Sequence, residues 1–182
     1  MEITEPLYVA NREAWRAWLQ HHHTSTNEIW LLYPRRAIGQ VRIPYVDAVE
    51  EALCFGWIDG QQKTFDAGHA AQRFTPRRRA SNWSALNKER ARLLCASGRM
   101  TPAGLAALGT VLEQPFSMPA DIQAALQAQP PAWENFQQFD PTYQRLRIGY
   151  IEEMRKRPDE FARRLANFLR RTALNQTFGV LP

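Results

Sequence analysis

The first side chains suited to chemistry lie at residues 59 to 63. Asp59 lies at the end of an expected strand, where an exposed carboxylate could act as a base or as a ligand, and Lys63 follows four residues on. Because Asp59 precedes Gly60, it could also bond the backbone of a turn, and a pair between Asp59 and Lys63 would be structural as well. We favour the structural interpretation of Asp59.

A second group of polar residues leads into an expected helix. It consists of Thr75, Arg77, Arg78 and Ser81, and Ser81 is the expected N-cap of a helix over 82–96. Free backbone N–H groups and the positive end of the dipole make a helix start suitable for anions, and arginines concentrate the field there. The pattern therefore predicts an anion site, for which the alternative is an ordinary solvated charged face.

Two residues of the same expected helix extend this candidate site. Trp83 and Asn87 share a face with Arg90 at spacings of four and three. Asn87 beside Trp83 could hold the planar group of a ligand. In the alternative interpretation Trp83 belongs to the core and Asn87 bonds a loop.

Other residue types used in catalysis do not form a recognisable arrangement. Cys54 could be a nucleophile with His69 nearby, but it lies in an apolar helical stripe, where cysteines are normally buried and inert. The histidines at 21–23 do not share a face, and no other ligand follows at a metal-binding spacing. The sequence also has no Gly-rich phosphate loop. We therefore predict no catalytic residue, no metal site and no cofactor.

The apolar pattern predicts an α+β fold to position these residues. We expect a small antiparallel sheet packed with helices over 1–114 and a C-terminal helical subdomain over 115–182, with the boundary marked by prolines in 113–119. The expected elements of the first part are a helix from Asn11 to about Gln20, a strand at 29–33 with 41–43 as its partner, and a helix at 46–55 ended by Gly56. Residues 57–60 and 72–75 then flank an antiparallel hairpin or a three-stranded excursion.

Later helices are marked by proline at their first position. Thr101-Pro102, Asp140-Pro141 and Pro158 each predict a helix start. We further predict that three aromatic side chains in strands or on an apolar helical stripe are largely buried, namely Trp57, Phe74 and Trp83.

Positive charge is concentrated in one segment. The formal net charge is +5, but residues 72–99 alone hold eight basic residues and one acidic residue. Of the 23 basic residues 20 are arginines, whose planar fork binds phosphate and carboxylate, although a GC-rich genome would give the same bias. An anionic partner, either a phosphorylated small molecule or a nucleic acid, fits this distribution.

Composition also limits the compartment. The two cysteines form no C-x-x-C motif, which favours a reducing environment. Residues 1–10 carry two glutamates and no apolar run, and no stretch approaches the ~18 apolar residues that cross a bilayer. We expect a cytoplasmic protein without integral membrane insertion, and the sequence leaves the oligomeric state open.

Several motifs follow one another from residue 50 onward. Residues 50–60 read EEALCFGWIDG, and they are followed by RFTPRR at 73–78, SNWS at 81–84 and GRMTPAG at 98–104. This order resembles the YdeI/OmpD-associated family, also called bacteriocin-protection proteins. The resemblance is strongest from Glu28 to Ala107 and looser in the C-terminal helices.

The resemblance implies a link to bacteriocin and envelope-stress protection and supplies no reaction. Our leading hypothesis is a non-catalytic protein that binds an anionic ligand through the residues described above: Asp59, Lys63, Thr75, Arg77, Arg78, Ser81, Trp83 and Asn87. One alternative is an enzyme that uses Asp59 and the neighbouring arginines on a phosphorylated or carboxylated substrate. Another is a protein–protein interaction module.

Overall fold

A computed structural model of the chain describes residues 3, 5–78 and 81–179, and these residues carry eight α-helices, one 3-10 helix (η1, Arg36–Ile38) and three strands. The predicted α+β class is confirmed. The chain divides into two units, of which the first comprises residues 1–81 and 91–109 and the second residues 82–90 and 110–182. The expected domain boundary at residue 114 stays a prediction.

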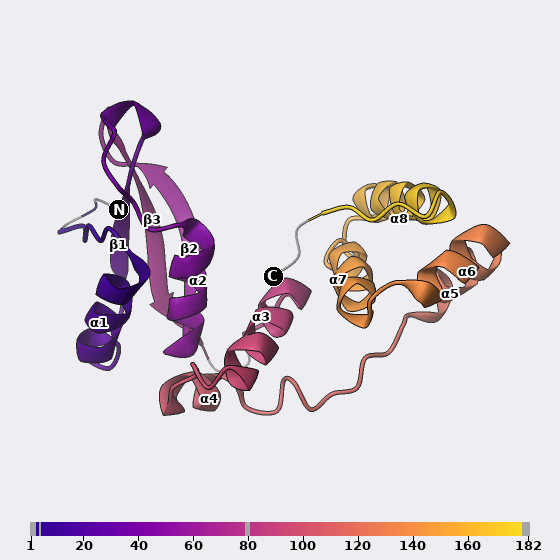
Figure 1. The fold of residues 1–182 in the computed structure, drawn as a ribbon, viewed down its shortest axis with the longest axis horizontal. Helices are drawn as coiled ribbons and strands as arrows, with labels where there is room; N and C mark the ends of the chain where they lie inside the picture. The colour runs from indigo at the N-terminus through magenta and orange to yellow at the C-terminus, as the bar shows by residue number, and fades with distance from the viewer. Residues whose placement is uncertain (1–2, 4, 79–80, 180–182) are drawn as a thin grey trace. The chain divides into compact units, whose positions relative to one another are not determined.

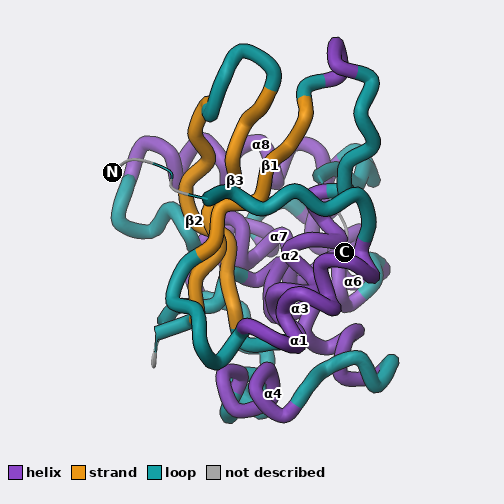
Figure 2. The backbone as a smooth tube through the Cα atoms, turned by 90° about the vertical axis from the view of Figure 1, so that its left-hand side faces the viewer, coloured by secondary structure: helices purple, strands orange, loops and turns teal. Residues whose placement is uncertain are grey.

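The first unit is built on an antiparallel sheet. Strands β1 (Ile29–Pro34), β2 (Trp57–Thr64) and β3 (His69–Pro76) are ordered β1-β3-β2, with β3 in the middle (Figures 1 and 2). The predicted hairpin of β2 and β3 is confirmed. The prediction of a strand at 41–43 as the partner of 29–33 is wrong, because residues 41–43 form no strand. One edge of β1 pairs with β3 along all six residues, and Leu7 occupies the other edge by backbone hydrogen bonds with Trp30 and Leu32.

Helix α1 (Arg12–His22) begins as predicted. The side chain of its N-cap Asn11 accepts a backbone hydrogen bond. The helix continues two residues past its expected end at Gln20. His21 Nδ1 lies 2.7 Å from the Ala17 carbonyl oxygen, so His21 is part of the polar end of the helix.

Helices α1 and α2 (Tyr45–Cys54) pack together on the sheet through Trp15. Its ring lies against Phe74 of β3, with centroids 5.4 Å apart, and its Nε1 donates to the Ala48 carbonyl at 3.0 Å. Trp57, Phe74 and Trp83 are 1%, 0% and 6% exposed, so the predicted burial of all three is confirmed. The largest fully buried side chains of this unit are Trp15, Leu19, Leu31, Ile43, Leu53, Trp57 and Phe74.

Helix α4 (Pro102–Leu108) packs against the end of α2. Gly56 follows α2 with a φ of +74°, a left-handed conformation that glycine adopts without strain. The hydroxyl of Thr101, the N-cap of α4, donates to the Cys54 carbonyl at 2.6 Å and accepts from the Gly104 N–H at 3.3 Å. One side chain therefore satisfies the end of one helix and the start of the next.

The second unit contains four further helices, α5 (Ala120–Gln127), α6 (Pro130–Gln138), α7 (Pro141–Glu152) and α8 (Pro158–Ala173) (Figure 1). The predicted starts of α7 and α8 are confirmed. Helix α3 (Ala85–Ala96) contributes its first half to this unit and its second half to the first unit. The buried core of the second unit consists of Ile122, Leu126, Ala132, Phe136, Ile148, Ile151 and Phe168.

The arginines of α8 differ in their exposure. The Arg163 side chain is 72% exposed, as expected for the outer face of an amphipathic helix, whereas the Arg164 side chain is only 15% exposed. The Arg164 guanidinium carbon lies 3.7 Å from the centre of the Tyr150 ring.

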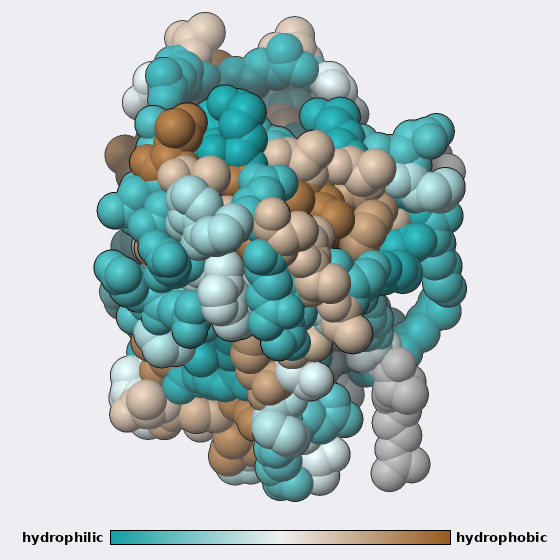
Figure 3. Space-filling model, turned by 90° about the vertical axis from the view of Figure 1, so that its right-hand side faces the viewer, coloured by the Kyte–Doolittle hydropathy of each residue, from teal (hydrophilic) through white to brown (hydrophobic). Residues whose placement is uncertain are grey.

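Figure 3 shows a face of the molecule on which brown apolar residues lie between teal hydrophilic ones.

Candidate functional site

Asp59 joins β2 to the start of α2. Its Oδ2 accepts a hydrogen bond from the Tyr45 hydroxyl at 2.5 Å. The turn that we expected at Asp59-Gly60 is wrong, because both residues lie within β2, just where its register with β3 shifts. The buried Gln72 donates to the Gly60 carbonyl at 2.8 Å. Asp59 is thus held by a side chain of α2, and Gly60 by a side chain of β3.

Arg77 follows β3 and is only half exposed. Its N–H donates to the Gly56 carbonyl at 2.9 Å, and its Nη1 donates to Ser81 Oγ at 3.3 Å. Burial lowers the pKa of Arg77 to about 10, and the negative charge of Asp59 opposes this shift. Arg77 is therefore partly buried, whereas its neighbour Arg78 is exposed.

Lys63 and Thr75 lie on the β2–β3 hairpin with other partners. Lys63 Nζ is 5.5 Å from the centre of the Trp30 ring. Thr75 belongs to the β2–β3 ladder. Nearby, Glu28 accepts from Trp30 Nε1 and from Arg73 Nε, each at 2.8 Å, and Arg73 lowers the pKa of the Glu28 carboxyl. The charge of Arg73, which belongs to the basic segment 72–99, is therefore paired.

The start of α3 differs from the sequence prediction. The helix begins at Ala85, and Ser84 Oγ accepts from the Asn87 N–H at 3.2 Å, so Ser84 and not Ser81 occupies the capping position. A serine three residues before Asn87 has the spacing that capping requires. Trp83 is buried, and Asn87 Oδ1 accepts from Arg90 Nη1 at 3.2 Å.

The eight predicted site residues are divided between the two units. Trp83 and Asn87 belong to the second unit. The other six belong to the first unit: Asp59, Lys63, Thr75, Arg77, Arg78 and Ser81. Within the first unit the structure brings Arg77 close to Asp59 and to Ser81. Their role in ligand binding stays a prediction.

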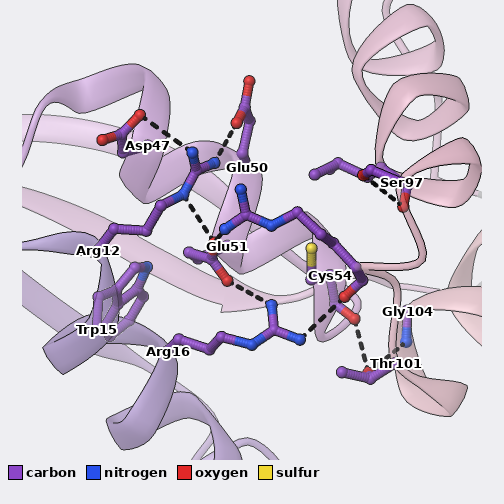
Figure 4. A network of polar contacts seen from close by, with 12 residues as sticks. Arg12, Trp15, Arg16, Asp47, Glu50, Glu51, Cys54, Ser97, Thr101 and Gly104 are labelled. Atoms are coloured by element: carbon purple, nitrogen blue, oxygen red, sulfur yellow. Dashed lines mark hydrogen bonds and ion pairs between the residues drawn. The ribbon is translucent and has the colours of Figure 1, made fainter.

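A network of arginines surrounds Glu51 in the first unit (Figure 4). Glu51 is fully buried, and its carboxylate accepts from Arg12 Nε at 2.8 Å, from Arg16 Nη1 at 2.7 Å and from Arg99 Nη2. Arg12 also pairs with two further acidic residues of α2. Three positive and three negative charges therefore meet, so the network is neutral and its role is structural.

Cys54 lies beside this network and is fully buried. Burial raises the pKa of its thiol to about 11, and the negative charge of Glu51 adds to the shift. The thiol is therefore protonated at neutral pH, whereas the nucleophilic form of cysteine is the thiolate. The predicted burial of Cys54 is confirmed, and its inertness stays a prediction.

Within residues 3, 5–78 and 81–179, no group of three or more His, Cys, Asp or Glu side chains is arranged to hold a metal ion. Among the helices of the described chain, none combines the length and the apolar character needed to cross a bilayer.

The second unit contains an open hollow of about 420 Å³, which we call the Arg147 hollow. Its walls come from the start of α3, from α7 and the residue after it, and from the C-terminal segment. The lining residues are Ser84, Ala85, Leu86, Leu146, Arg147, Tyr150, Glu153, Phe178 and Gly179.

Arg147 is the buried cation of this hollow, at 7% exposure. Its guanidinium carbon lies 5.5 Å from the centre of the Tyr143 ring, 5.6 Å from that of Tyr150 and 5.3 Å from that of Phe178. Burial lowers the pKa of Arg147, because removal from water disfavours the charged form. A cation in this environment gains from a neighbouring anion more than an exposed one does.

Two contacts fix α3 against α7 at the hollow. Arg145 donates to both carboxylate oxygens of Glu89, at 2.7 and 2.9 Å. At Gly149 an added Cβ would come within 2.2 Å of the Ala85 Cβ, so only glycine lets the first turn of α3 lie this close. The position of the α3 start beside Arg147 therefore depends on Gly149.

Our sequence analysis missed Arg147. It is one of nine basic residues in the last 38, and neither the local charge nor any motif distinguishes it. A usable signal was present in the helical spacing, since Tyr143 lies four residues before Arg147 and Tyr150 three residues after it. Phe178 is brought in by the fold and carries no such signal.

These features define a protein with an α+β unit and a helical unit in which a buried arginine borders an open hollow. Residues 7–107 match the family described as a domain of unknown function, DUF8412, and the chain belongs to that family. Residues 115–175 match the family described as bacteriocin-protection, YdeI or OmpD-associated. Neither the curated proteins nor the solved structures gave a match.

The family matches confirm the resemblance and correct its position. The bacteriocin-protection match lies in the C-terminal helices, where we considered the resemblance loose. The motifs at 50–104, on which the resemblance rested, lie within the other family's match. Arg147, Tyr143 and Tyr150 belong to the bacteriocin-protection segment.

Proposed function

We propose that this protein binds a small anion in the Arg147 hollow without transforming it, and that it does so in the cytoplasm. The observation that carries the proposal is a guanidinium buried to 93% in the wall of an open hollow. The match of the surrounding helices to the bacteriocin-protection family supports a role of this binding in protection.

The physical basis is the cost of keeping Arg147 away from water. Its lowered pKa reflects that cost, and an anion in the hollow would add a favourable contact to those that the guanidinium makes with three aromatic rings. A charge-assisted hydrogen bond contributes about 1.5 to 3 kcal/mol. Ser84, the cap of α3, lines the same hollow, so the positive end of that helix would favour the same ligand.

A small anion fits the structure better than a nucleic acid does. Binding a phosphate backbone needs exposed basic side chains along a surface. In the basic segment, Arg73 is paired with Glu28, Arg99 is paired with Glu51, and Arg90 is buried. Much of the positive charge of this segment is therefore engaged in contacts within the protein.

The test compares Arg147→Gln with Arg163→Gln by thermal unfolding in sodium phosphate and in sodium chloride of equal ionic strength. Both changes remove one positive charge, but the exposed Arg163 is paired with Glu160 on α8. We expect phosphate to stabilise the wild type and Arg163→Gln equally and to stabilise Arg147→Gln much less. Equal stabilisation of all three proteins would mean that phosphate acts only as a general stabilising salt, and would refute the proposal.

A further inference from the structure

One end of the sheet in the first unit carries exposed basic and apolar side chains. Figures 1 and 2 show that the loop after β1, which contains η1, reaches the same end of the sheet as the turn between β2 and β3. We call this end the η1 tip, and its members are Arg35, Arg36, Ile38, Val41, Arg42 and Phe65. We propose that the η1 tip docks onto a lipid bilayer that carries anionic headgroups, a function separate from that of the Arg147 hollow.

Direct contacts hold the loop against the turn. The Arg35 N–H donates to the Gly68 carbonyl at 2.8 Å, and Arg42 Nη1 donates at 3.3 Å to the carbonyl of Pro34, the last residue of β1. A Cβ added at Gly68 would lie 2.3 Å from Ile38 Cδ1, so Ile38 lies directly against the turn. Two segments distant in the sequence therefore form one surface.

Three apolar side chains of the tip face solvent. Ile38 is 44% exposed, Val41 68% and Phe65 40%. The backbone at Val41 is held in place, because the Tyr8 hydroxyl donates to its carbonyl at 2.5 Å. A single exposed apolar side chain is ordinary, but three on two adjoining segments form a group whose burial is favourable. The boundary between headgroups and acyl chains of a bilayer offers that burial.

The arginines give the same surface an excess of positive charge. Arg35, Arg36 and Arg42 are exposed, and among the described residues no carboxylate pairs with any of the three. Residues 35–42 and 64–69 contain one acidic residue, Asp66. Its Oδ1 accepts from two backbone N–H groups of the turn, at 2.7 Å each, and lies 2.9 Å from His69 Nδ1. The three arginine charges therefore remain available to an anionic surface.

Anionic lipid fits the η1 tip better than a nucleic acid does. A nucleic acid would offer phosphates to the arginines and would leave most of the apolar side chains in water. A bilayer offers phosphates in its headgroups and hydrocarbon just beneath them, so arginine and apolar side chains on one surface are bound together. Only lipid uses both kinds of side chain.

The experiment sediments the whole chain with vesicles of phosphatidylcholine alone and of equal parts phosphatidylcholine and phosphatidylglycerol. We expect binding to the mixed vesicles and none to phosphatidylcholine alone, because the arginines need anionic lipid. Added salt should weaken binding without abolishing it, since salt screens the charges but not the apolar contacts. A DNA duplex is tested in parallel.

Two sets of variants separate charge from apolar contact. Arg35→Gln combined with Arg36→Gln should weaken vesicle binding about 25-fold, at about fivefold for each arginine. Val41→Ser combined with Phe65→Ser should weaken it about tenfold and leave only salt-sensitive binding. Val41→Ser alone should give a smaller loss in the same direction, and it keeps the test valid if Phe65→Ser disturbs the turn.

The matched controls lie at the other end of the sheet. Arg78→Gln removes an exposed arginine that follows the far end of β3. Leu105→Ser removes a side chain that is 49% exposed on α4, which packs beside Gly56 just before β2 begins. Both controls should bind vesicles within about twofold of the wild type.

Four results would overturn the proposal. The first is the absence of binding to the mixed vesicles. The second is wild-type binding by the Val41 and Phe65 variants, which would reduce the contact to charge alone. The third is an equal loss in the control variants, which would indicate unspecific attraction to the whole chain. The fourth is DNA binding that depends on Arg35 and Arg36 while the vesicles are not bound, which would make a nucleic acid the partner.

Discussion

Two buried charges in this molecule are accommodated in opposite ways. In the first unit, Glu51 is surrounded by Arg12, Arg16 and Arg99 in a network whose charges balance. In the second unit, Arg147 lies among aromatic rings and borders a hollow. The buried carboxylate is therefore held by ion pairs, whereas the buried guanidinium contacts the faces of aromatic rings.

The comparison shows why counting arginines is a poor guide to function. The segment 72–99 drew attention because it carries eight basic residues. Several of these basic residues are paired or buried. The arginine on which we base the proposed function, Arg147, lies outside this segment, on α7. What matters is the environment of each guanidinium, and that is set by residues distant in the sequence.

The largest expected effect is that of Glu51→Gln. It leaves three arginines around a neutral amide, and breaking a buried ion pair from one side costs about 3 to 5 kcal/mol. Chemical denaturation measures the loss. Glu50→Gln is the control, because Glu50 is partly exposed and should cost less than about 1 kcal/mol. Equal losses would show that burial does not distinguish the two carboxylates.

The next effect tests how α3 is held at the Arg147 hollow. Gly149→Ala places a methyl group 2.2 Å from the Ala85 Cβ, and overpacking of this kind costs about 1 to 3 kcal/mol. The gain in helix propensity offsets part of that cost. Gly149→Ala should also weaken anion binding at the hollow. Adding Ala85→Gly removes the methyl group that clashes, so the double variant should regain both stability and anion binding. A double variant no better than Gly149→Ala would mean that the two helices do not meet at this point.

Arg147→Met should change stability much less than Glu51→Gln does. The change gives up attraction to three rings but removes a buried charge, and exchanging a buried charge for an apolar side chain of similar size is often near neutral. We expect a difference within about 1 kcal/mol in urea unfolding, together with loss of anion binding. A loss above about 3 kcal/mol would place Arg147 with Glu51 as a structural charge.

The sequence predicted the elements better than their partners. Caps and proline starts identified α1, α4, α7 and α8, because those signals are local. The pairing of 29–33 with 41–43 was wrong, since β3 and Leu7 occupy the two edges of β1 and no local signal identifies these distant partners. Ser81 was expected to cap α3, but the helix begins at Ala85 and Ser84 takes this role, so the sequence pattern identified the helix and not its first residue.

The candidate site shows the same limit. Asp59 and Arg77 were recognised as residues suited to chemistry, and the structure does bring them close together. Their partners Tyr45 and Gly56 come from another helix and a helix end, which spacing in the sequence does not reveal. The hollow at Arg147 needs α3, α7 and the C-terminal segment at once, so no single stretch predicts it.

The smallest expected effect is that of replacing Arg78, whose neighbour Arg77 looks the same in the sequence and should cost more. Arg78 is exposed, so Arg78→Ala should change unfolding free energy by less than about 0.5 kcal/mol. Arg77→Ala should cost about 1 kcal/mol or more, because it removes the bond to Ser81 and the packing of a half-buried stem. Chemical denaturation of the two single variants measures the difference, and phosphate-dependent thermal shifts should be as in the wild type for both. A lost phosphate response in either variant would return the anion site to the first unit, where the sequence had put it.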